Sequence, residues 1–130
     1  MYTGGADRRP GPDGLGYEVR GVRFTCEVTF SDPRLSGKQT TDINEDCFAE
    51  GGCVNWGTME IVGPDGTWRG WFAGNEDPNT NTNLYIVLSG EGEYEGLVNI
   101  RHATGPFYGP MAQVGVIYRG DPPPMPPSPE

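Results

Sequence analysis

Four side chains in this sequence could transfer protons or stabilise charge in a reaction: Glu60, Glu95, Arg101 and His102. A carboxyl group on an apolar strand face, as at Glu60, can have a raised pKa and act as an acid, but it can also sit in water at a rim. His102 is the only histidine, and its alternative role is that of a hydrogen-bonded strand residue. No Gly-x-Ser-x-Gly elbow is present, and no cysteine has zinc-ligand spacing from His102. These four residues are the catalytic candidates, and we expect neither a metal nor a cofactor.

The segment 93–103 alternates between two sets of side chains. One face carries His102 with four other residues, and the opposite face carries Glu95, Asn99 and Arg101. If that second face points inward, these three residues form a polar wall around a ligand. The alternative is that this polar face is solvated.

Aromatic residues are frequent enough to line a ligand cavity. The predicted ligand-binding residues are Trp56, Trp68, Trp71, Tyr85, Asn99 and Tyr118. Phe107 and Tyr108 could contribute to the same lining. The alternative role for each aromatic ring is core packing or turn anchoring.

The three cysteines divide into a pair and a single residue. Cys47 and Cys53 flank a five-residue segment, across which a local disulfide is geometrically easy. Cys26 lies on the apolar face of an alternating segment, so we expect a buried free thiol.

Two segments are rich in oxygen ligands, residues 42–46 and 75–81. Calcium prefers such oxygens, so a calcium-binding adhesion module is a third hypothesis. Neither segment has EF-hand spacing, and Asn and Asp are also ordinary turn residues.

The elements that must position these residues are strands. Residues 22–30 alternate strictly between apolar and polar side chains, and the sequence Gly63-Pro64-Asp65-Gly66 is typical of a hairpin turn. Further strands are predicted at 38–44, 53–62, 67–73, 84–88, 93–103 and 111–119. No helical periodicity is present. The sequence therefore predicts an all-β, antiparallel up-and-down barrel of about seven or eight strands, with a β-sandwich as the runner-up.

The composition predicts one domain with two extensions. Residues 1–16 are predicted to be an irregular N-terminal arm, residues 17–119 the barrel, and residues 120–130 a Pro-rich tail. Of 130 residues, 21 are glycine and 13 proline, which fits many tight turns.

The strand-and-turn pattern of residues 56–61, 66–70, 90–97 and 115–117 resembles that of the allene oxide cyclase barrel group. This group includes dirigent-type proteins, bacterial spirotetronate cyclases and many bacterial relatives that share the turn Gly-x-Gly-x-Tyr-x-Gly. The resemblance implies a barrel that binds an apolar or polyketide-like substrate and acts by orienting it. Such a cyclase or isomerase needs no acid or base. No catalytic residue of the group can be matched to this chain.

The net charge of −9 excludes classes of partner. Nucleic acid and anionic membrane surfaces would be repelled, and no apolar run is long enough for a transmembrane helix. Residues 1–16 lack the apolar core of a signal peptide, so we expect either an intracellular chain or a mature extracellular one.

The leading hypothesis is a barrel that binds a small apolar ligand. The alternative is a non-catalytic secreted module that self-associates, as a homo-oligomer, through its N-terminal arm and Pro-rich tail.

Overall fold

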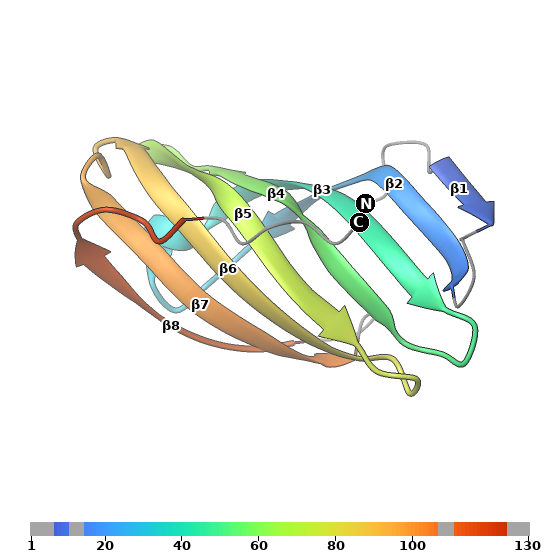
Figure 1. Ribbon diagram of the computed structural model, residues 1–130. Coiled ribbons are helices and arrows are strands. Elements are labelled where there is room, and N and C mark those ends of the chain that lie inside the picture. The colour runs from blue at the N-terminus through green and yellow to red at the C-terminus, as the bar shows by residue number, and fades with distance from the viewer. Residues whose placement is uncertain (1–6, 11–14, 107–110, 125–130) are drawn as a thin grey trace.

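The computed structural model describes residues 7–10, 15–106 and 111–124. These residues form one eight-stranded antiparallel sheet in which the strands follow one another in chain order (Figure 1). The strands are β1 (Asp7–Pro10), β2 (Leu15–Val28), β3 (Gly37–Phe48), β4 (Cys53–Val62), β5 (Gly66–Glu76), β6 (Asn81–Gly92), β7 (Leu97–Pro106) and β8 (Ala112–Arg119). The helical structure of the described residues is one 3₁₀ turn, η1 (Pro33–Leu35). The prediction of an all-β, up-and-down fold is confirmed.

The sheet is strongly curled, but its hydrogen-bonded ladder is not closed (Figure 1). Within the described residues β8 pairs with β7 alone, and no ladder connects it to β1 or β2. After β2 the chain leaves the sheet, and the segment 30–35 lies beside β8 instead of pairing with it. We call the gap between this segment and β8 the seam. The molecule is thus a barrel-like sheet with one open seam.

Turn chemistry decides where the strands end. β4 has the predicted bounds, and the predicted hairpin is closed by a hydrogen bond from Gly63 N–H to the Gly66 carbonyl oxygen. β7 begins at Leu97 rather than at residue 93, because Gly92 and Gly96 adopt φ angles of 69° and 85° and turn the chain. Residues 7–10, assigned by sequence to the irregular arm, form β1. The remainder of 1–14, and residues 125–130 of the tail, lie outside the described residues.

The two faces of the sheet have different environments. Residues opposite one another in the ladder share a face, which assigns Met59, Phe72 and Leu88 to the same, inner face. The inner face holds the hydrophobic core, whose buried members are Leu35, Met59, Ile61, Trp68, Phe72, Ile86, Leu88, Tyr94 and Ala103. The inner face is therefore the first place to look for functional side chains that need a protected environment.

The curl depends on glycines at inner-face positions. A Cβ at Gly57 would collide with the Asp42 carbonyl oxygen, and one at Gly70 with that of Val87. Both glycines lie opposite the backbone of a neighbouring strand, so side chains there would prevent the close approach. Glycines at these positions let the sheet bend around a small core.

Trp68 closes one end of the curled sheet. Its side chain is fully buried, its Nε1 donates a hydrogen bond of 2.8 Å to the Arg34 carbonyl oxygen, and its ring stacks on Tyr94 at 5.3 Å. A Cβ at Gly90 would collide with Tyr94. The turn Gly-x-Gly-x-Tyr-x-Gly therefore places a tyrosine inside the end of the sheet, against Trp68 and the segment that carries η1.

We predict that Trp68→Ala lowers the free energy of unfolding by about 3–5 kcal/mol, because it leaves a large cavity and an unbonded Arg34 carbonyl. Trp71→Ala, on the outer face of the same strand, is the matched control and should cost much less. Urea unfolding of both variants measures the difference. Equal losses would contradict the assignment of Trp68 as the end closure.

Candidate functional site

Arg101 is a buried cation on the inner face of β7. Only 4% of its surface is exposed, although arginine is almost never buried without a partner. Nη1 donates to Asn99 Oδ1 at 3.2 Å, and Nη2 donates to the Met59 sulfur at 3.2 Å. The Phe30 ring centroid lies 4.7 Å from the guanidinium carbon. The guanidinium is therefore held in one orientation by neutral groups.

The charge of Arg101 is not neutralised within the described residues. No described carboxylate forms an ion pair with it, and its buried Nε has no hydrogen-bond partner there. Burial lowers the pKa of Arg101 to about 10. Each pKa unit corresponds to 1.36 kcal/mol, so keeping this group charged at neutral pH costs the folded state about 3 kcal/mol. An uncompensated cost of this size marks a candidate functional residue.

Two cavities adjoin the contact between Arg101 and Met59. One, of about 180 Å³, occupies the seam and is lined by Arg101, Asn99, the segment 30–35 and residues 113–117. The other, of about 260 Å³, lies over β2–β6. Its wall consists of six apolar side chains and three polar ones: Phe24, Ile43, Met59, Phe72, Leu84 and Met111, with Gln39, Thr41 and Thr82. We call these the seam cavity and the apolar cavity.

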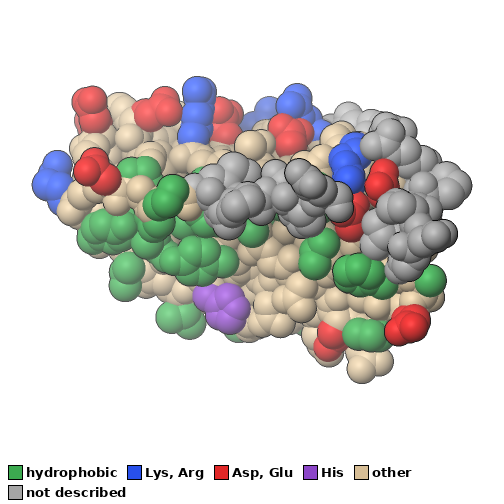
Figure 2. Space-filling view, viewed as in Figure 1, with side chains coloured by type: hydrophobic (Ala, Val, Ile, Leu, Met, Phe, Trp, Pro, Cys, Tyr) green, Lys and Arg blue, Asp and Glu red, His purple; other side chains and the backbone are tan. Residues whose placement is uncertain are grey.

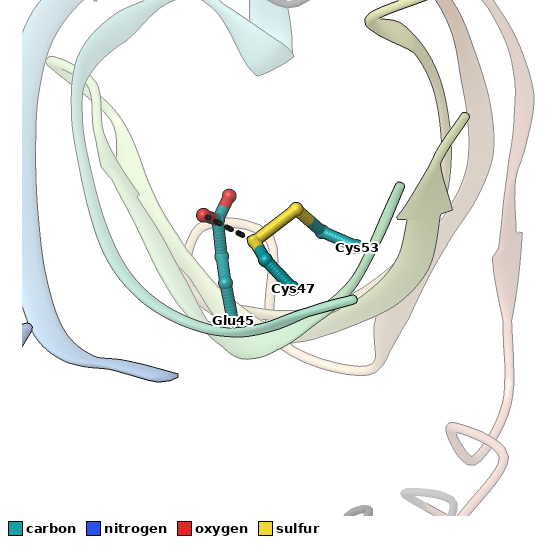
Figure 3. Close-up of side chains that lie close together, drawn as sticks. All are labelled: Glu45, Cys47 and Cys53. Atoms are coloured by element: carbon teal, nitrogen blue, oxygen red, sulfur yellow. Dashed lines mark hydrogen bonds between the residues drawn. A yellow bond between two sulfur atoms is a disulfide. The ribbon is translucent and has the colours of Figure 1, made fainter. Parts of the chain in front are cut away.

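The predicted disulfide between Cys47 and Cys53 is confirmed. It joins β3 and β4 directly across the ladder, with the two Cα atoms 4.0 Å apart, and it points into the space that the sheet encloses (Figure 3). The Glu45 carboxylate lies beside it and accepts a hydrogen bond of 2.7 Å from Asn55 Nδ2. Glu45, Cys47 and Cys53 lie as close together as the ligands of a metal ion would. The two sulfurs are joined in a disulfide, however, and so offer no thiolate to a metal.

The prediction that Cys26 is buried is wrong. Cys26 is a free and exposed thiol. It does lie on the inner-face row, opposite Gln39. However, β1 pairs only with residues 17–20 of β2, so the rest of β2 is an edge strand that nothing described pairs from the other side.

Three of the four catalytic candidates lie outside the enclosed space. Glu60 is on the outer face, where its carboxylate forms an ion pair of 2.7 Å with Arg69 at a broad polar depression. Glu95 is exposed in the turn before β7, and His102 is exposed on the outer face of β7. Of the predicted polar wall, Asn99 and Arg101 point inward and Glu95 does not.

The predicted ligand-binding aromatics are also divided between the faces. Trp68 is buried in the inner core, whereas Trp56, Trp71, Tyr85 and Tyr118 belong to outer-face rows. Figure 2 shows apolar side chains gathered around the histidine on part of this outer face. The outer aromatics make local contacts, such as Arg20 over the Trp56 ring and Trp71 against Tyr85. Phe107 and Tyr108 lie outside the described residues.

The two oxygen-rich segments are structurally explained without a cation. Asp42 forms an ion pair with Arg23, and Asp46 forms one with Arg20. Asp77 accepts hydrogen bonds from the backbone of Asn79 and Asn81, which lower the pKa of its carboxyl group and close a turn. Asp42, Asp46 and Asp77 thus serve the strand and turn structure.

Sequence reasoning missed Met59, Phe30 and Thr82 as cavity residues. Met59 alternates with Ile61 in the predicted strand 53–62, which is the signal that could have found it. Sequence reasoning had no such signal for Thr82, because Thr82 precedes the predicted strand 84–88. It also missed Glu76, opposite Cys53, where burial and then the nearby Asp77 raise the pKa of its carboxyl group. Phe30 is the last apolar residue of the predicted alternation 22–30, so the same kind of signal places it on the apolar face, although in the structure it follows the end of β2.

We predict that Arg101→Met raises the free energy of unfolding by about 1–3 kcal/mol at pH 7. Methionine keeps the volume and removes a buried charge without a described counter-ion. Arg23→Met is the control, because Arg23 is exposed and paired, and it should leave stability little changed or slightly lower. Denaturant unfolding of the unliganded variants tests this, and a large loss in Arg101→Met would make Arg101 a structural residue.

The described residues contain no helix with the length and hydrophobicity that crossing a membrane requires. Comparisons with protein-family models, with curated proteins and with solved structures return no match. The resemblance to the allene oxide cyclase group stays a prediction, and any function must be argued from the cavities and Arg101.

Proposed function

We propose that this protein binds a small apolar molecule on the concave face of its curled sheet. The observation that carries the proposal is the apolar cavity of about 260 Å³, with six of its nine lining residues apolar. Concave sites with mostly apolar walls and a few polar groups are typical of small-molecule binding. The buried Thr82 hydroxyl lines this cavity and has no hydrogen-bond partner among the described residues. It could therefore orient a ligand.

A cyclase or isomerase would be the enzymatic form of the same proposal. The cavity wall contains no carboxylate and no histidine among the described residues. A reaction there would depend on holding a flexible chain in a reactive shape, which can lower a barrier by several kcal/mol without proton transfer. The resemblance to orienting barrel enzymes supports this form.

Ligand binding can be tested by filling the apolar cavity. Leu84→Trp adds bulk on the inner face, and Tyr85→Trp is the matched control, since Tyr85 is the next residue, exposed on the outer face. We expect the neutral dye N-phenyl-1-naphthylamine to bind the native protein saturably and to be displaced by 1-octanol. Leu84→Trp should weaken dye binding at least about tenfold, because the ligand must displace the new ring, and Tyr85→Trp should not. Fluorescence titration measures both, and a native protein without saturable dye binding would refute the proposal.

Self-association is the second candidate function, and the edge strand β8 favours it. Val114 and Val116 are 78% and 60% exposed, and residues 112–118 carry no charged side chain. Edge strands are normally protected by charges or proline, and two copies of such an edge could pair antiparallel. Of the N-terminal arm and the Pro-rich tail, residues 1–6, 11–14 and 125–130 lie outside the described residues.

We predict that, if β8 is a dimer interface, Val116→Lys shifts the protein to monomer. Val62→Lys is the control, because Val62 is 45% exposed on β4, which has strands on both sides. Sedimentation velocity across a range of concentrations measures the change. A native protein that remains monomeric at high concentration would remove this candidate.

A further inference from the structure

We propose that the seam cavity is an anion subsite in which Arg101 binds the carboxylate of a small apolar acid. The subsite deepens the proposed function, on which it rests for the apolar character of the ligand. The two cavities are linked, because Met59 lines the apolar cavity and contacts Arg101, which lines the seam cavity.

Arg101 has hydrogen-bond donors without a described partner beside the seam cavity. Asn99 and Met59 each take one hydrogen from the two terminal nitrogens, and Nε has no partner in the described structure. In arginine the Nε hydrogen and a hydrogen of the neighbouring terminal nitrogen form the fork that binds a carboxylate through two parallel hydrogen bonds. Nε is buried, so a small shift of the side chain toward the seam cavity would present this fork to a carboxylate there. The side chain is 4% exposed and borders the seam cavity, so a bound carboxylate would contact a guanidinium that is largely desolvated.

The scaffold around Arg101 is fixed before any ligand binds. Asn99 accepts from Arg101 and donates to the Val116 carbonyl oxygen at 3.1 Å, which ties the guanidinium to β8. Phe30 packs over the guanidinium at 4.7 Å. Such preorganisation reduces the entropy lost on binding, which distinguishes a built site from a surface arginine.

The cavity and its charges select the ligand class. A volume of about 180 Å³ is close to the roughly 150 Å³ of an engineered cavity known to bind benzene, so a single ring or a short chain fits. Phe30, Leu35 and Ile117 supply apolar wall, and the two charged residues at the rim, Asp32 and Arg34, already pair with one another at 2.7 Å. One guanidinium edge matches a monoanionic carboxylate better than a phosphate, which would need more donors.

Benzoate and its neutral analogue benzamide test the charge requirement. We expect benzoate to raise the melting temperature of the native protein and to bind at least tenfold more tightly than benzamide by isothermal titration calorimetry. Equal binding of the two, or no benzoate binding, would overturn the anion subsite. The neutral dye titration described above stays separate, so its success with no benzoate preference would retain the proposed function and reject this inference alone.

Variants assign the effect to Arg101. Arg101→Met should abolish the benzoate preference, and Arg101→Lys, which keeps the charge but loses the fork, should weaken benzoate binding at least fivefold. Arg23→Met is the matched control and should bind benzoate as the native protein does. If charge alone matters, Arg101→Lys will bind benzoate as tightly as the native protein. That result would overturn the bidentate geometry. Undiminished benzoate binding by Arg101→Met would overturn the site.

Discussion

The curvature of the sheet depends on inner-face positions that carry no side chain. At Gly57 and Gly70 the backbone of the neighbouring strand occupies the space that a Cβ would need. An eight-stranded sheet of ordinary composition would be flatter and would expose its apolar face. Because this one bends tightly, a modest set of core residues can bury itself, and the concave side can enclose ligand-sized space.

The open seam determines how Arg101 is buried and how one end of the sheet is packed. A closed ladder would have placed a strand beside β8, whereas here the chain turns inward after β2 and lays Phe30 and Leu35 beside β7 and β8. This segment supplies the Arg34 carbonyl that Trp68 binds and the Phe30 ring that packs over Arg101. The same departure from closure thus stabilises one end of the sheet and desolvates a cation. Both features depend on the segment 30–35.

Period-two patterning and turn residues were sufficient to predict the all-β meander, the bounds of β4 and the hairpin at Gly63–Gly66. Spacing along the chain was sufficient for the Cys47–Cys53 bridge. The pattern could not say which face is inside, and so Trp68 and Trp71, three residues apart, were given one role although they lie on opposite faces. Nor could it show that Arg101 meets Met59, 42 residues away, because that neighbour depends on the register of four strands. Cys26 was misjudged because burial at an edge depends on what pairs beyond it.

The contrast between the cysteines has a practical consequence. The paired cysteine residues are buried, at 2% and 8% exposure, while Cys26 is exposed to solvent. A maleimide dye or nitroxide would therefore attach at a single native position, with no engineered handle and with the bridge intact. Because Cys26 lies opposite Gln39, which lines the apolar cavity, such a probe would sit next to one wall of that cavity and report on what binds there.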